Sequence, residues 1–258
     1  MHHLRLISSI VDCPVIALDA MRGRHEFGQC GRDYPSALRL VRSLFFDQTG
    51  ALPTHELENI SVADFDRILD TLHSQLFGSQ YECQSQCVQC QADFEFAVHS
   101  NDIFASVEDN PLDVKAGHEL GIFETRDGVK FRLPTVKETL LGKSAEQICE
   151  DVSLSGEFHS IDQADAAFRG AAPIGIQDID AICPECEADQ RVRFDLVQYV
   201  MTMLDRERVF LIQEFHSLAA HYGWSFTEIA NLERRVRRDF AALITQERAR
   251  RSVHRLRA

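Results

Sequence analysis

The sequence lacks the features that mark several common protein classes. Across its 258 residues, no apolar run approaches the length of about 20 residues that a membrane-spanning helix needs. The apolar stretch at residues 4–18 is interrupted by Asp12 and Pro14 and has no secretory signal character. These absences predict a soluble protein that is not exported and does not bind a membrane.

Motifs of common catalytic sites are also missing. The glycine-rich segment at residues 170–175 lacks the Gly-Lys-Ser/Thr that holds phosphates and magnesium in a phosphate-binding loop. The chain contains no Gly-x-Ser-x-Gly nucleophile elbow. His216 and His221 lie five residues apart, without the glutamate that a zinc protease motif requires. The sequence therefore predicts a protein that is not an enzyme and has no small-molecule substrate.

Four of the eight cysteines form two Cys-x-x-Cys pairs with a similar sequel. The pairs are Cys87-Val-Gln-Cys90 and Cys183-Pro-Glu-Cys186. Each pair is followed by one further residue, then by Ala-Asp, and then by a predicted short strand. One such turn directs two sulfurs toward one place, and two turns supply the four soft ligands of a closed tetrahedral site. We therefore expect a structural Zn²⁺ bound by Cys87, Cys90, Cys183 and Cys186, in a split zinc ribbon.

The interval between the two pairs is long for a zinc ribbon. A spacing of about 15–20 residues is usual, whereas residues 91–182 separate the pairs here, so we expect an insertion with structure of its own. Because loop-closure entropy grows only logarithmically with length, such an insertion is tolerable. The alternatives are an iron–sulfur cluster, free thiols and disulfides, and an intracellular location disfavours the disulfides.

The other cysteines lack this spacing. Cys83 lies four residues before Cys87 and competes for a ligand place, but the tighter Cys-x-x-Cys turn favours Cys87 with Cys90. The isolated cysteines are predicted to be buried apolar thiols: Cys13, Cys30 and Cys149.

Hydrophobic periodicity along the rest of the chain predicts an α+β fold. Helical N-terminal and C-terminal segments are expected around a split zinc-ribbon-like core with short antiparallel strands. The predicted division is residues 1–82 (helical), residues 83–192 (the split zinc ribbon with an inserted hairpin and helices) and residues 193–258 (helical, with an arginine-rich end).

Capping and turn residues define several of these elements. Ser61 and Gly78 bracket a predicted helix, and Asp127-Gly128 predicts the turn of a hairpin over residues 121–133. Two pairs have the spacing of a capping box: Thr135 with Glu138, and Ser225 with Glu228. Periodicity predicts further helices at residues 35–48, 137–141, 194–221 and 234–251, but only one short helix between residues 144 and 180.

Charge is divided unevenly along the chain. Residues 233–258 hold nine arginines against three acidic residues, which gives +6 and leaves −19 for the remainder of a chain whose net charge is −13. A basic helix can bind nucleic acid, but an acidic body repels that polyanion, so a protein partner is the favoured interpretation. We expect the arginines at the start of this helix to be exposed for docking, with apolar residues facing inward: Phe240, Leu243 and Ile244.

Several stretches taken in order resemble the baseplate hub assembly proteins of contractile-tailed, T-even-type phages and of phage-tail-like contractile injection systems. They are residues 66–78 (DRILDTLHSQLFG), residues 131–135 (FRLPT), Cys183-Pro-Glu-Cys186, and residues 214–229 (EFHSLAAHYGWSFTEI) followed by Arg234-Arg235. Together they span about residues 35–245. The first cysteine pair departs from the family's proline-containing pattern at Val88-Gln89, and Cys83 is an additional cysteine.

The resemblance implies a non-enzymatic chaperone or structural protein in baseplate assembly. Its partners would be hub, spike, tube or wedge proteins, which it would bind in the cytoplasm of the bacterial host. The resemblance leaves open whether the protein departs after assembly or remains in the finished baseplate. The alternative is a zinc-ribbon protein that binds nucleic acid through its C-terminal arginines. A metalloenzyme is disfavoured, because four thiolates leave no open ligand position.

Overall fold

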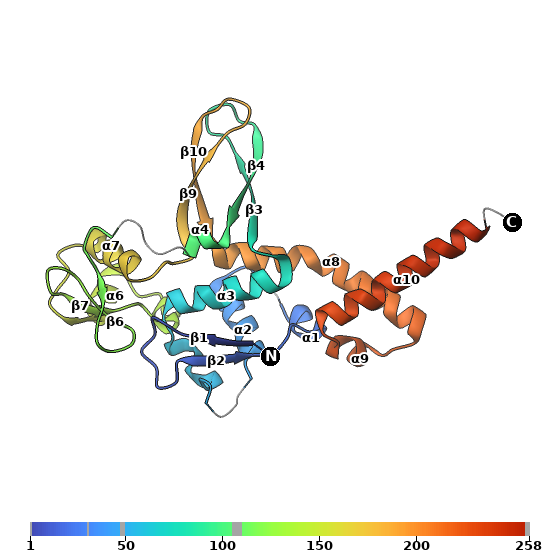
Figure 1. Cartoon of the computed structure of the whole chain (residues 1–258), viewed down its shortest axis with the longest axis horizontal. Coiled ribbons are helices and arrows are strands. Elements are labelled where there is room, and N and C mark those ends of the chain that lie inside the picture. The colour runs from blue at the N-terminus through green and yellow to red at the C-terminus, as the bar shows by residue number, and fades with distance from the viewer. Residues whose placement is uncertain (1, 30, 47–49, 105–109, 256–258) are drawn as a thin grey trace. The chain divides into compact units, whose positions relative to one another are not determined.

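A computed structural model of the chain describes residues 2–29, 31–46, 50–104 and 110–255, with side chains described up to residue 250. The fold is α+β, as predicted, with many helices and small antiparallel sheets (Figure 1). The chain divides into two compact units. The smaller unit comprises Met1–His2, Leu18–Phe46 and Met201–Ala258, and the larger comprises His3–Ala17 and Asp47–Val200. Each unit thus combines stretches that are far apart in the sequence.

The larger unit contains most of the strand residues and the helices between them. Its elements outside the cysteine hairpins are β1 (His2–Arg5), β2 (Val15–Leu18), the 3₁₀-helix Thr54–Asn59, α3 (Val62–Phe77), α4 (Ser100–Phe104), β5 (Lys115–Ala116), β6 (Ile122–Glu124), β7 (Lys130–Arg132), α5 (Val136–Leu140), α6 (Ala145–Val152), β8 (Ser153–Ser155) and α7 (Ile161–Ala171). Residues 144–180 hold two helices, α6 and α7, where only one short helix was predicted. Helix α7 begins after Ser160, whose hydroxyl accepts a hydrogen bond from the Gln163 amide.

Helix α3 forms where the sequence places a cap, an apolar stripe and a stop. The Ser61 hydroxyl accepts a hydrogen bond from the Asp64 amide at 3.1 Å, which satisfies one of the unpaired donors of the first turn. Phe65 and Leu69 on one face of the helix are buried. The helix ends at Gly78, whose φ of 101° is one that glycine adopts without strain. The predicted bounds are confirmed.

The predicted inserted hairpin is also present. Strands β5, β6, β7 and β8 form one antiparallel sheet in chain order, and Phe123 on β6 pairs with Phe131 on β7. These two rings, with Leu133 and the small side chain of Ala167 on α7, make the core of this part of the larger unit.

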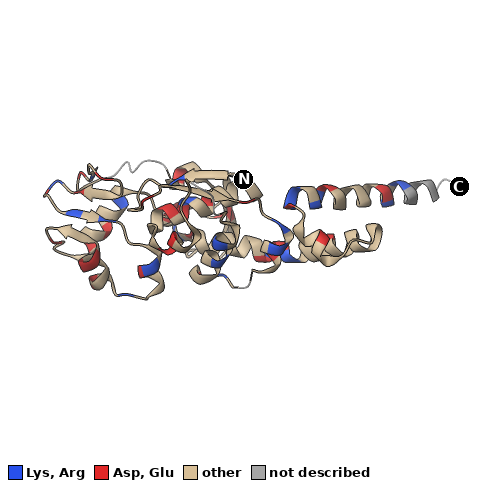
Figure 2. Cartoon of the chain, turned by 90° about the horizontal axis from the view of Figure 1, so that it is seen from below, with Lys and Arg blue, Asp and Glu red and all other residues tan. Residues whose placement is uncertain are grey.

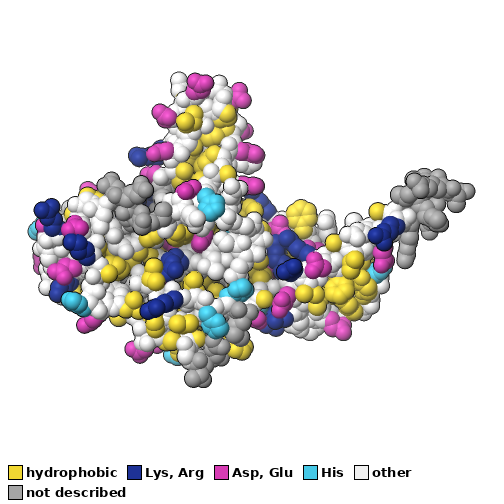
Figure 3. Space-filling view, in the orientation of Figure 1, with side chains coloured by type: hydrophobic (Ala, Val, Ile, Leu, Met, Phe, Trp, Pro, Cys, Tyr) yellow, Lys and Arg dark blue, Asp and Glu magenta, His cyan; other side chains and the backbone are white. Residues whose placement is uncertain are grey.

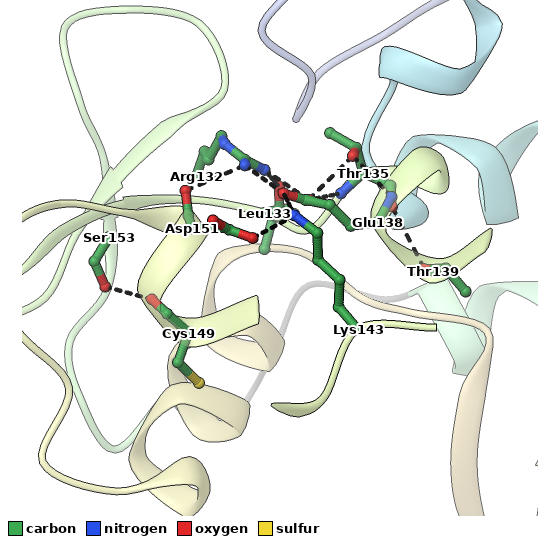
Figure 4. A network of polar contacts seen from close by, with 9 residues as sticks. All are labelled: Arg132, Leu133, Thr135, Glu138, Thr139, Lys143, Cys149, Asp151 and Ser153. Carbon is green, nitrogen blue, oxygen red and sulfur yellow. Dashed lines mark hydrogen bonds and ion pairs between the residues drawn. The ribbon is translucent and has the colours of Figure 1, made fainter. Parts of the chain in front are cut away.

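A polar network joins this hairpin to the two helices that follow it (Figure 4). Arg132 donates two hydrogen bonds to Glu138, at 2.9 Å and 2.6 Å. Glu138 also accepts from the Thr135 amide at 2.8 Å, in the predicted capping box. Burial of Glu138 opposes its ionisation, but the hydrogen bonds from Arg132 and Thr135 outweigh burial and lower the pKa of Glu138 to about 2.

The smaller unit is helical. It holds α1 (Gly23–Phe27), α2 (Tyr34–Leu44), α9 (Phe226–Asn231), α10 (Arg234–Arg255) and, from Met201 onward, α8 (Leu196–Tyr222). Phe215 and Leu218 of α8, Ile229 of α9 and Ile244 of α10 pack in one core. Leu243, predicted to face inward, is 49% exposed, because it lies next to the buried Ile244 and therefore about 100° around the helix.

Two of the four arginines at the start of α10 are buried, although the sequence predicted that all four are exposed for docking. Arg234 and Arg237 are only 5% and 1% exposed, and both donate to the buried carboxylate of Glu26 on α1. Arg237 also donates to Glu214 at 2.6 Å, and Arg234 to Glu207 at 2.7 Å, both on α8. Figure 2 shows Lys and Arg positions at the start of α10 and again toward its end. Arg234 and Arg237 thus stabilise the smaller unit, whereas Arg235 is exposed.

Candidate metal centre

Each Cys-x-x-Cys pair lies at the tip of a long β-hairpin. The first hairpin pairs β3 (Gln80–Gln86) with β4 (Asp93–His99), and the second pairs β9 (Ile176–Ile182) with β10 (Asp189–Asp195). Both belong to the larger unit, and we call the two hairpins together the arm; Figure 1 shows them side by side with their tips together. Sequence patterns indicated the strand after each pair and missed the strand before it. Alternation in residues 178–181 (DIDA) was the signal that could have found β9.

The two turns share one backbone geometry. In each, the amide of the first cysteine donates to the carbonyl two residues beyond the second cysteine, at 2.9 Å for Cys87 and 3.0 Å for Cys183. In each, the residue after the second cysteine has a positive φ, 62° at Gln91 and 59° at Glu187. A non-glycine residue in this region of φ carries strain of about 1 kcal/mol or more. The pairs are thus a structural repeat as well as a sequence repeat.

The four predicted ligands meet at one place. Their sulfur atoms all lie within 4.8 Å of one another, with 3.6 Å between Cys87 and Cys186 and 3.7 Å between Cys90 and Cys183. All four cysteines are free rather than joined in disulfides. A tetrahedral ion with metal–sulfur distances of about 2.3 Å needs sulfurs about 3.8 Å apart, so these two distances fit such an ion. The cluster can therefore hold a metal ion.

Hydrogen bonds and crowding give these thiols unequal acidity. The amides of Cys90 and Gln89 donate toward the Cys87 sulfur, at 3.5 Å and 3.4 Å, and lower the pKa of Cys87 to about 6. The Ala188 amide lowers the pKa of Cys186, but burial and the neighbouring sulfurs outweigh it and raise that pKa to about 12. Because four thiolates this close repel one another, a bound cation is what lets all four ionise together.

Gln190 of β10 joins the two turns. Its buried side chain accepts a hydrogen bond from the Val88 amide at 3.0 Å and donates to the backbone carbonyls of Ala188 and Asp189. The cysteine spacing did not indicate this role. The signal was available in the repeat, since Gln190 occupies the position that the apolar Phe94 takes in the first hairpin.

An aromatic cluster supports the base of the arm. Tyr81 of β3 stacks on His73 of α3, with ring centroids 4.4 Å apart, and lies 5.2 Å from the rings of Phe194 on β10 and Tyr199 on α8. The Tyr81 hydroxyl donates to Asp70 of α3 at 2.6 Å. The first hairpin is therefore anchored to α3 and α8, and Phe194 joins the second hairpin to Tyr81 and to α8.

A buried carboxyl group makes a second anchor at this base. Asp66 of α3 accepts a hydrogen bond from the Gly175 amide at 2.7 Å, just before β9. The Gly175 carbonyl accepts from the Leu196 amide at the start of α8. Burial raises the pKa of Asp66 to about 7, against the opposing effect of the Gly175 hydrogen bond.

The remaining cysteines lie away from the cluster. Cys83 is on β3, where its thiol is directed to the Tyr81 carbonyl at 3.8 Å, so it takes no ligand place. Cys13 and Cys149 are partly exposed rather than buried as predicted, because neither belongs to one of the described hydrophobic cores. Cys30 lies outside the described residues.

Within the described part of the chain, none of the helices combines the length and the apolar character that a membrane crossing requires. Comparisons with models of known protein families, with curated proteins and with solved structures give no match to this chain.

Proposed function

We propose that this chain is a non-enzymatic assembly protein of a contractile-tail baseplate, held in shape by a structural Zn²⁺ in a split zinc ribbon. The metal part rests on one observation: four cysteine sulfurs from two hairpin tips lie within 4.8 Å of one another. Sulfur ligands favour zinc, and a set of four fills its tetrahedral coordination, which leaves no position for a substrate or a reactive water. The site then stabilises the arm rather than catalysing a reaction.

The biological part of the proposal rests on the order of the sequence stretches that resemble baseplate hub assembly proteins. The partners are then hub, spike, tube or wedge proteins of such a tail. A closed structural site agrees with that role, because an assembly protein needs fixed surfaces rather than an open ligand position.

The charge of the arm disfavours the nucleic-acid alternative. Residues 80–99 and 176–195 hold nine acidic residues against two arginines, Arg191 and Arg193. Both arginines pair with acidic residues across their own hairpin, at 3.6 Å to Asp180 and 3.2 Å to Asp178. A surface of this charge repels a phosphate backbone.

A pull-down tests the proposed role. Tagged chain is co-expressed with the hub, spike, tube and wedge proteins of a contractile tail from the same source, beside Cys186→Ser and the matched control Cys83→Ser. We expect the parent and Cys83→Ser to retain baseplate proteins, and Cys186→Ser to lose them. Recovery of no baseplate protein by the folded parent would contradict the assembly role, and salt-sensitive retention of DNA would favour the nucleic-acid alternative.

A further inference from the structure

The two hairpins of the arm are near copies that differ in surface charge. On the exposed face of the second hairpin, Arg191 lies across the strand pair from Asp180, and Arg193 lies across from Asp178. These ion pairs, at 3.6 Å and 3.2 Å, balance four of the five exposed charges on that face and leave only Asp189 over.

The first hairpin lacks this compensation. When the cysteine pairs are aligned, Glu95 and Ala97 occupy the positions of Arg191 and Arg193. The exposed face of β3 and β4 then presents three carboxylates, which we call the acidic face: Glu82, Asp93 and Glu95. Among the described residues, no ion pair involves any of the three, and the Gln84 side chain donates a hydrogen bond to Glu95 at 2.7 Å. Figure 3 shows acidic side chains along both edges of the arm. This face therefore has a negative charge that no lysine or arginine of its own hairpin balances.

The acidic face borders a hollow suited to a long cationic side chain. Its lining includes Asp93 and Glu95, the amide side chain of Gln84, and the apolar groups of Phe94 and of Pro184 from the second turn. An arginine can bind carboxylates through its planar guanidinium while its methylene stem lies along apolar atoms. Two apolar side chains at the tip of the arm, Val88 and Ile182, are 80% and 66% exposed and can add contact area.

The chain itself carries a complementary surface at the end of α10. The last residue of this helix that packs in the core is Ile244, and every described side chain from 245 to 250 is exposed. Residues 245–255 hold four arginines against one acidic residue, Glu247, and we call them the arginine end. Most helices in proteins owe their stability to packing of one face. A basic helix end without such packing is a surface that gains from an acidic partner.

We propose that the arginine end of one copy of this chain docks on the acidic face of a second copy. The two surfaces differ, so the contact is heterologous, and each docked copy keeps one surface of each kind available. Association then continues past a dimer into rings or open chains. The proposal does not depend on the role in baseplate assembly.

The full-length protein tests this directly by sedimentation equilibrium over a range of protein concentrations. Between about 0.01 M and about 1 M salt, the Debye length falls from about 30 Å to about 3 Å. We expect the average mass in low salt to rise with protein concentration beyond that of a dimer, and to fall to that of a monomer in high salt. A monomer under all conditions, or an association that high salt leaves unchanged, would overturn the proposal.

Charge-reversed variants locate the contact. Asp93→Lys with Glu95→Lys, and separately Arg248→Glu with Arg250→Glu, should each weaken association by about tenfold or more, since each variant replaces two attractive charges of the contact by repulsive ones. Mixing the two variants should restore association, because each then meets an opposite charge. Glu119→Lys with Asp127→Lys makes the same change in net charge at exposed positions outside the acidic face and should leave association at the parent level.

Folding of the variants is checked independently. Circular dichroism and retained metal content confirm an intact arm, and Glu82→Gln with Glu95→Gln is a milder version of the acidic-face variant that should weaken association less. A folded acidic-face variant that associates like the parent, or a mixture that stays as weak as its components, would show that the contact lies elsewhere.

Discussion

Replacing Glu26 by glutamine should destabilise the smaller unit strongly. Glu26 is the buried carboxylate that Arg234 and Arg237 share, and the substitution leaves two buried guanidinium groups with one fewer counter-charge. Removal of one partner from a buried ion pair costs about 3–5 kcal/mol. Because Glu207 and Glu214 still contact these arginines, we expect a loss near the lower end of that range.

The assay is urea unfolding followed by tryptophan fluorescence. Trp224 is the only tryptophan of the chain and packs against Phe240 in the core of the smaller unit, so its emission reports that unit. Glu233→Gln is the matched control: Glu233 is about half exposed and lies 3.6 Å from Arg22, and the loss of such a surface pair costs about 0–1 kcal/mol. If Glu26→Gln lowers the free energy of unfolding as little as the control does, the claim that Arg234 and Arg237 stabilise the smaller unit is refuted.

Three further predictions concern the larger unit and the start of α10. The pKa of Glu138 is about 2 in the folded chain against an ordinary 4.5, so the stabilisation from its ionised form is complete above pH 4.5 and is lost as the pH falls toward 2. This loss should lower the free energy of unfolding by about 3 kcal/mol at most. In Glu138→Gln, the free energy of unfolding measured against pH should lack this decrease. Gln190→Leu leaves the Val88 amide without its acceptor and should lower the free energy of unfolding in urea by about 1–3 kcal/mol. A variant as stable as the parent would contradict this. Arg237→Glu should yield little folded protein by circular dichroism, because it places a third carboxylate beside Glu26 and Glu214, whereas the exposed Arg235→Glu should fold normally.

Local chemistry made part of the fold predictable from the sequence. Capping residues such as Ser61 and Thr135 act within four residues of the helix they start, so their effect is visible without any tertiary information. The cysteine pairs are similarly local, and their repetition indicated the shared site although 92 residues, 91–182, separate them.

The features that prediction missed depend on contacts between distant residues. Arg237 and its partner Glu26 are 211 positions apart, and the charge pattern of α10 alone cannot distinguish a buried pair from an exposed arginine. Strand β3 escaped detection because its polar residues, Gln80, Gln84 and Gln86, gave no apolar run, and it is stabilised by pairing with β4 and by Tyr81 at its base.

Elemental analysis of the purified chain tests the central claim, the four-cysteine metal site, most directly. The account predicts one zinc ion per chain in the parent and in Cys83→Ser, because Cys83 takes no ligand place. Cys186→Ser should lose the metal and become protease-sensitive in both hairpins, since the site joins them. A zinc content near zero in the folded parent, an iron-rich brown sample, or full zinc retention in Cys186→Ser would contradict it.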